Sequence, residues 1–190
     1  MKRYKQLVLV FMILCLTAAA APAYAITPLK VAVLPVMNTA KYRYPEDLGV
    51  IQNTLIKPFK YPYYTLLPLA AVDDTVKQFL QANKGRKCSD QQVMAELAGK
   101  LSADLVVVAE LSQLRLDRMY SYNYDDTYIR SDVALTAYAY SALTKKYDRI
   151  KVTKAEIEAE SVDTNAPAIL QDLTEQILVK LPYKRIPVSP

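Results

Sequence analysis

The sequence predicts one α/β (α+β) domain, with helices packed on a mixed sheet in the order β-α-β-α-α-β-β-β-α. Two continuous apolar runs, over 29–36 and 103–111, are typical of strands buried on both faces. The segments between them carry apolar residues at helical spacing. From Leu111 the pattern changes to alternation of apolar and polar residues, which predicts antiparallel strands with one face partly open.

The first half of the domain is expected to begin with a strand at 29–36. A helix over 45–57 follows, because Pro45 suits the first helical position and Pro58 stops the helix. The segment 61–68, limited by Pro62 and Pro68, predicts a second strand. The apolar face of this first helix would consist of Leu48, Ile51 and Leu55.

Two further helices are predicted over 69–85 and 88–101. In the first, Asp73 and Asp74 would lie in the opening turn, where carboxylates favour the helix dipole, and Gly85 would follow the end. In the second, Ser89 and Gln92 match a capping box.

Three long strands and a helix complete the domain. The apolar run 103–111 continues into an alternating segment, in which Leu114, Leu116, Tyr120, Tyr122 and Tyr124 share one parity. A turn at 123–126 leads to a strand over 127–143, and a second turn leads to a strand over 147–160. The final helix would be capped by Asn165 and stopped by Pro182, with a face of Leu170, Leu173, Ile177 and Leu181.

The first 25 residues have the layout of a cleavable secretory signal peptide. Three basic residues precede an apolar run, and the small residues Ala23 and Ala25 flank Tyr24. Cleavage would leave a mature chain from Ile26, with the domain over 26–182 and a mobile tail over 183–190. The run is short for a membrane anchor, and Leu14 before Cys15 does not suit lipidation. We therefore expect export to the periplasm or the extracellular space, with no stable transmembrane segment after cleavage.

Composition narrows the classes of partner. The signal contains three of the 24 Lys and Arg residues and none of the 19 Asp and Glu residues, so the mature net charge is 24 − 3 − 19 = +2. That small excess gives no reason to expect nucleic acid as a partner. Cys88 is the single mature cysteine, so no intramolecular disulfide can form; it is either free or part of an intermolecular bond.

The residues needed for common enzyme chemistry are missing. The chain has three glycines, none between Val36 and Pro45, and therefore no glycine-rich phosphate loop. It has no histidine, which excludes His-dependent triads and His metal sites. We predict no catalytic, cofactor-binding or metal-binding residues and no cofactor. The acidic groups are better explained by a helix start (Asp73, Asp74), a turn (Asp125, Asp126) and a solvated strand face (Glu156, Glu158, Glu160).

Aromatic residues gather near the first hairpin turn. We predict a partner-binding surface formed by Tyr120, Tyr122, Tyr124, Tyr128 and Arg130. Tyrosine offers a large amphipathic area and is enriched at interfaces. The competing interpretation is cross-strand packing on a half-buried face, since tyrosine also favours strands.

Two segments resemble a superfamily of bacterial envelope domains. They are "KVAVLPVMNT", followed by a helix and "YYTLLP", and "LAGKLSADLVVVAEL". The group includes the periplasmic domain of the curli secretion channel, the N-terminal domain of the Tol-system β-propeller protein, and the lipoprotein activators of penicillin-binding proteins. The resemblance implies non-enzymatic work at the cell envelope by assembly or docking. The chain has no lipobox cysteine and no β-propeller. Polar residues occur all along the predicted hairpin strands, so a channel role is not expected.

The function predicted from the sequence is protein–protein interaction or assembly in the envelope, with an envelope protein or a second copy as partner. A small-molecule or glycan-binding protein that uses the tyrosine-rich face is the first alternative. An enzyme with an unrecognised carboxylate site is the second.

Overall fold

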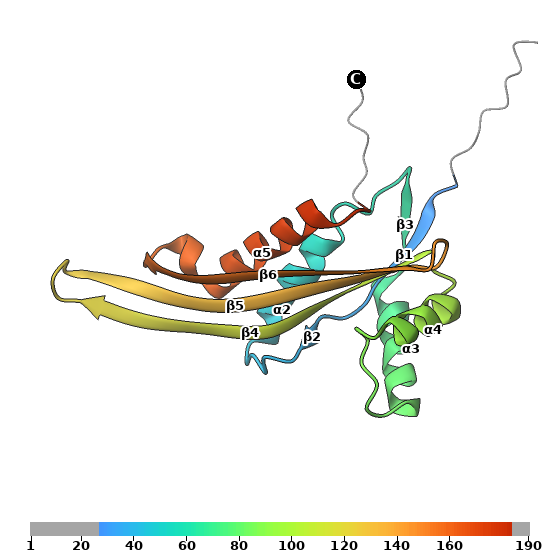
Figure 1. Ribbon diagram of the computed structural model, residues 1–190, viewed down its shortest axis with the longest axis horizontal. Coiled ribbons are helices and arrows are strands. Elements are labelled where there is room, and N and C mark those ends of the chain that lie inside the picture. Colours follow the sequence, from blue (N-terminus) through green and yellow to red (C-terminus); the bar gives the residue numbers. More distant parts are fainter. Residues whose placement is uncertain (1–26, 184–190) are drawn as a thin grey trace, which may run out of the picture.

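A computed structural model describes residues 27–183, which form one mixed six-stranded sheet with helices on both faces (Figure 1). The strand order is β3-β1-β4-β5-β6, with β2 beside β4. β1 runs parallel to β3 and β4, whereas β4, β5 and β6 are antiparallel. The predicted fold class is confirmed; the short β2 and η1 were not expected. The elements are β1 (Leu29–Val33), β2 (Met37–Asn38), α2 (Pro45–Leu55), β3 (Tyr64–Leu66), α3 (Leu69–Ala82), α4 (Gln91–Leu101), β4 (Leu105–Ser121), β5 (Asp126–Ser141), β6 (Lys146–Ala159), η1 (Val162–Thr164) and α5 (Ala166–Lys180).

Each face of the sheet has its own hydrophobic core. On one face, Val31, Val107 and Leu135 pack with buried residues of α2 and α5. On the other face, Ala32 and Val106 pack with buried residues of α3 and α4. Burial on both faces is the reason that β1 and the start of β4 have continuous apolar sequences.

The distal half of the sheet extends beyond α3 and α4. β4 has 17 residues and β5 has 16, so each is roughly 55 Å long at about 3.3 Å per residue. Figure 1 shows the β4–β5 hairpin reaching away from α3 and α4, while α5 remains over β6. One face of the distal sheet is therefore covered by a helix, and the opposite face is not.

A β-bulge at Ser112 keeps the apolar residues of β4 on one face. Leu111 pairs with Leu135 and Gln113 pairs with Ala134, which leaves Ser112 as the extra residue. The residues on the α2/α5 face accordingly change from odd to even numbers: Leu105, Val107, Ala109 and Leu111 before the bulge, then Leu114 and Leu116 after it. The change of parity in the sequence at Leu111 is the signal of this bulge.

We expect deletion of Ser112 to retain the fold. Every later residue of β4 keeps its partner on β5, so a regular ladder replaces the bulge. Deletion of Val108 is the contrasting case. Residues of β4 next to the deletion must shift by one position to stay paired with β5, and this shift turns the Glu110 side chain toward the α2/α5 core. A buried, unpaired carboxylate costs on the order of several kcal/mol. Thermal unfolding of the two variants checks this; equal melting temperatures would contradict it.

Helix starts differ from the expectation in two places. α3 begins at Leu69, so Asp73 and Asp74 lie beyond its first turn, and their assignment to that turn was wrong. α4 begins at Gln91 with Asp90 as N-cap, so the predicted capping box of Ser89 and Gln92 was also wrong. Ser89 is buried and its carbonyl accepts a hydrogen bond from the Tyr147 hydroxyl at 2.7 Å, which delays the helix start.

A capping box occurs instead at η1, between Ser161 and Thr164. The predicted Asn165 cap of α5 is confirmed, since its side chain accepts a hydrogen bond from the Ala168 amide at 2.9 Å.

The two ends of the chain are described only in part. The predicted signal over 1–25 lies outside the described residues and stays a prediction. Tyr183, the first residue of the predicted tail, donates a hydrogen bond to Asp148 at 3.0 Å, and its carbonyl accepts one from Tyr64. The remainder of that tail, 184–190, also lies outside the described part. Within residues 27–183, no helix is long and apolar enough to cross a membrane.

Candidate functional site

The hairpin tip, residues 119–128, exposes several aromatic rings. Tyr122 is 91% exposed, Tyr124 is 76% exposed and Tyr120 is 51% exposed. The rings of Tyr120 and Tyr122 meet edge to face, with their centroids 5.0 Å apart. By contrast, Tyr138 and Tyr140 on the same strand pair are buried against α3 and α4. Cross-strand core packing therefore describes Tyr138 and Tyr140, and it does not describe the tip.

Of the remaining predicted site residues, Tyr128 lies at the end of the tip and Arg130 lies beside it. Tyr128 pairs with Met119 across the hairpin, and Arg130 pairs with Asp117 further down the same two strands. A shallow depression of about 270 Å³ is lined by Met119, Tyr120, Ser121, Tyr124, Tyr128 and Ile157. Arg130 lines a second depression together with Ile157. The fold thus brings Tyr120, Tyr124 and Tyr128 together, with Tyr122 in ring contact and Arg130 next to them.

Charged side chains around the hairpin are already paired. Arg115 contacts Asp117 at 2.7 Å, and the Arg130 guanidinium lies 3.6 Å from Asp132. Exposed pairs of this kind contribute little to stability, about 0–1 kcal/mol. They leave the guanidinium groups accessible, since the side chain of Arg115 is 70% exposed and that of Arg130 is 56% exposed.

The predicted turn role of the acidic pair agrees with its contacts. Asp125 has a positive φ of 50° and accepts a hydrogen bond from the Tyr120 hydroxyl. Asp126 accepts one from the Thr127 amide at 2.8 Å. These local bonds stabilise the turn that presents the tyrosines.

A larger cleft lies between the starts of α2 and α5. It has a volume of about 500 Å³, and its lining includes Tyr42, Tyr44, Leu116, Ile129 and Asn165. The Tyr42 hydroxyl donates to Asp47 at 2.6 Å; burial and this carboxylate both raise the pKa of Tyr42. Sequence reasoning missed this cleft, because it joins segments far apart in the chain.

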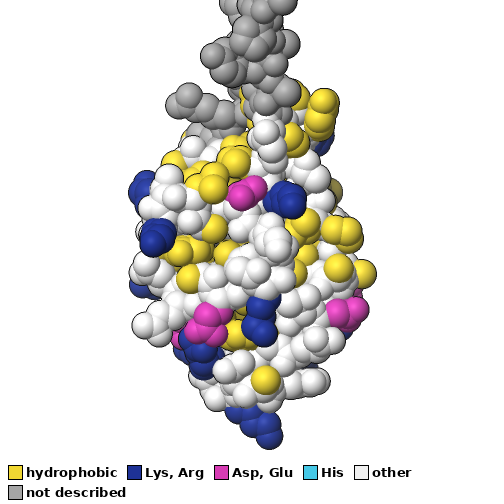
Figure 2. All heavy atoms as spheres, turned by 90° about the vertical axis from the view of Figure 1, so that its right-hand side faces the viewer, with side chains coloured by type: hydrophobic (Ala, Val, Ile, Leu, Met, Phe, Trp, Pro, Cys, Tyr) yellow, Lys and Arg dark blue, Asp and Glu magenta, His cyan; other side chains and the backbone are white. Residues whose placement is uncertain are grey.

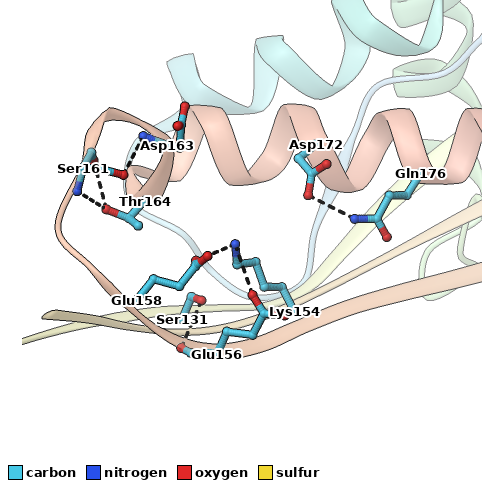
Figure 3. Close-up of polar contacts among 9 residues, drawn as sticks. All are labelled: Ser131, Lys154, Glu156, Glu158, Ser161, Asp163, Thr164, Asp172 and Gln176. Carbon is cyan, nitrogen blue, oxygen red and sulfur yellow. Dashed lines mark hydrogen bonds and ion pairs between the residues drawn. The ribbon is translucent and has the colours of Figure 1, made fainter.

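A groove between α5 and β6 was also missed. It has a volume of about 270 Å³ and is lined by Lys154, Asp163, Ala168, Ile169 and Asp172. Figure 3 shows Lys154, Glu156 and Glu158 on the side of β6 that faces α5, with Asp172 on the helix above. A signal for it exists in the sequence: residues 155–179 contain six Asp and Glu residues and no Lys or Arg.

Charge is distributed differently at the opposite end of the molecule. Figure 2 shows that end, where Lys and Arg side chains are interspersed with Asp and Glu side chains and with small apolar areas. No single sign of charge gathers on that face, so the α5–β6 region differs from it in electrostatic character.

The described residues offer little for covalent or metal chemistry. Cys88 is a buried, free thiol, and burial followed by the charge of Asp90 raises its pKa, which lowers its reactivity. Within residues 27–183, no group of three or more Cys, Asp or Glu side chains is placed to hold a metal ion.

Comparisons with known proteins give likenesses of fold only. No family model matches the chain, and no curated protein matches it. Lipoprotein GNA1162 from Neisseria meningitidis is 16% identical, with a TM-score of 0.47, covering 79% of this chain and 98% of its own. The PelC dodecamer from Paraburkholderia phytofirmans is 14% identical, with a TM-score of 0.44 and coverages of 84% and 91%. The LpoB C-terminal domain from Escherichia coli is 11% identical, with a TM-score of 0.42 and coverages of 74% and 93%.

The first of these structures is a lipoprotein by its name. The resemblance to bacterial envelope domains, including its curli and Tol parts, stays a prediction. At these identities and TM-scores the likenesses do not assign a function, so the proposals below are argued from the chain's own residues.

Proposed function

We propose that this protein is an exported, non-enzymatic envelope domain that binds another envelope protein through its hairpin tip. The observation that carries the proposal is the exposure of Tyr122 and Tyr124, at 91% and 76%, at the end of a long hairpin. Large exposed aromatic rings that gather in one place mark interaction sites, whereas single scattered ones do not.

The position of the rings suits contact with a second protein. The hairpin strands are continuous and paired along their length, so the tip is presented by a regular sheet rather than by a long loop. Tyrosine loses little conformational entropy when it is ordered at an interface, and arginine is also enriched at interfaces. Arg130 lies two residues from Tyr128 on β5, beside the tip.

The two alternatives have less support from the geometry. The depression among the tip tyrosines, about 270 Å³, falls below the roughly 300–1,000 Å³ of common small-molecule pockets. The larger cleft lies away from those tyrosines. For an enzyme, the carboxylate pair Asp125 and Asp126 is engaged in turn contacts.

The test is the double variant Tyr122→Ala, Tyr124→Ala in the full-length protein. We expect recovery of the envelope partner after cross-linking to be lost, because the rings are the accessible apolar area. The melting temperature should be unchanged, since truncation of exposed residues usually costs within about 0.5 kcal/mol.

Tyr61→Ala is the matched control, because Tyr61 is 82% exposed but lies near β3, at the other end of the molecule. It should leave recovery intact. Unchanged recovery in the double variant would refute the proposal. A large fall in melting temperature would show that the rings belong to the core.

A further inference from the structure

We propose that the α5–β6 groove is a second binding site, which takes an extended basic segment of a partner protein as an added strand beside β6. The segment would pair with the free edge of β6, place Lys or Arg side chains under α5 and place apolar side chains on the uncovered face. This site adjoins the hairpin tip, because Ile157 also lines the tip depression. It uses the backbone of β6 and the charges beside α5 rather than the tip tyrosines, so each of the two proposals can fail without the other.

The backbone of β6 offers unpaired groups along its outer edge. β6 stands at the end of the strand order, and no strand of the described chain pairs with its outer edge. The Glu160 amide donates to the Thr127 carbonyl at 2.8 Å, and the Glu156 carbonyl accepts from the Ser131 hydroxyl. The backbone N–H and C=O groups of the even-numbered residues of β6 therefore point toward β5. Because the backbone N–H and C=O groups of successive residues point to opposite sides of a strand, those of Ala155, Ile157 and Ala159 point away from β5.

Two of the usual protections against pairing, a proline and a β-bulge, are absent from this edge. Over 153–159 β6 contains no proline, and its pairing with β5 is regular, without a bulge. Natural edge strands are normally blunted by such features or are covered by another element. An edge left open beside a helix is the arrangement in which extended peptides bind by strand addition.

The charges on the α5 side select a basic occupant. Lys154 is the single base there and is shared by two acids: its ammonium group lies 2.6 Å from Glu158 and 3.5 Å from Glu156. Asp163 and Asp172 line the same groove, so this region contains four acidic side chains and one basic side chain. The ammonium or guanidinium groups of an added strand would compensate this excess, whereas an acidic strand would be repelled.

The opposite side of the same edge is apolar and exposed. Ala155, Ile157 and Ala159 lie on the uncovered face, and Ile157 is 61% exposed. Side chains of an added strand alternate between the two faces. The occupant defined by this geometry is therefore a strand in which basic and apolar residues alternate.

Titration with three short capped peptides tests the proposal. The first alternates lysine and valine, the second alternates glutamate and valine, and the third has the first sequence with N-methylated amides on the pairing edge. We expect the lysine peptide to bind with amide shifts confined to β6 and α5. The glutamate peptide and the N-methylated peptide should both bind at least tenfold more weakly. The negative charges of the first are repelled by the acidic groove, and the methylated amides of the second cannot donate hydrogen bonds to β6.

Variants of the protein locate the site. Ala155→Pro removes an outward amide and should weaken binding of the lysine peptide at least tenfold, whereas Ala155→Val, which keeps the amide, should not. Glu158→Gln with Asp172→Asn should weaken it similarly, and Asp125→Asn with Asp126→Asn at the hairpin tip should leave it unchanged. Equal binding of the N-methylated peptide, or shifts away from β6, would overturn the proposal even if the proline variant failed to fold.

Discussion

Replacement of Leu135 with alanine is expected to lower the free energy of unfolding by about 2–5 kcal/mol. Leu135 is fully buried in the middle of β5, where it pairs with Leu111 on β4 and with Val152 on β6. Its side chain lies in the core beneath α2 and α5. Truncation leaves a cavity between three strands and a helix layer, and paired strands cannot move together to fill it.

Leu143→Ala is the matched control for this prediction. Leu143 is 64% exposed in the turn between β5 and β6, so the same substitution should change stability by within about 0.5 kcal/mol. Chemical denaturation of both variants gives the comparison. Equal losses of stability would show that the core assignment of Leu135 is wrong.

Stability is expected to fall at alkaline pH, between about pH 10 and pH 12. Burial, followed by a hydrogen bond to Glu110, raises the pKa of Tyr138 to about 12. Burial and the carboxylate of Asp148 likewise raise the pKa of Tyr183 to about 12. An unfolded chain titrates its tyrosines near pH 10. The folded state therefore favours the neutral phenols, and this stabilisation is complete below about pH 10 and is lost as the pH rises through about 12.

The substitution Tyr138→Phe isolates one of these groups. It removes the ionisable hydroxyl, so the unfolding free energy should depend less on pH over the same window. Tyr122→Phe, at the exposed hairpin tip, should retain the full dependence of the parent protein. Denaturant titrations across the window measure both. A Tyr138→Phe variant with the parent's pH dependence would contradict the assignment.

The hairpin tip shows how much of a candidate site the sequence can predict. Alternation placed the tyrosines on strands beside a turn predicted at 123–126, and the structure has the turn one residue earlier, at 122–125. The sequence left open whether the rings were buried. Tyr120 and Tyr138 look alike in their local pattern, but Tyr138 is buried beneath α3 and α4, whereas Tyr120 is 51% exposed near the end of the hairpin. Which residues a helix layer covers is a long-range property.

The α5–β6 groove shows the opposite case. Its acidic residues form a visible run in the sequence, but a run of acids is equally consistent with a solvated surface. The sheet order places β6 at the edge with α5 above it. Only this arrangement puts the acidic side chains in a groove, beside backbone amides of β6 that point outward. Strand order depends on contacts between distant segments, which no local pattern contains.

Local patterns by themselves determined the elements of this protein. Apolar periodicity depends on neighbouring residues, so it was sufficient for the buried strands β1 and β4, for the faces of α2 and α5, and for the Asn165 cap. Tertiary structure decided three features that these local patterns do not determine. The burial of Ser89 moved the start of α4, the pairing of β4 with β5 placed the bulge at Ser112, and the ending of α3 and α4 short of the hairpin exposed the tip. Each of these outcomes depends on which distant surface covers a residue, and that surface exists only once the chain has folded.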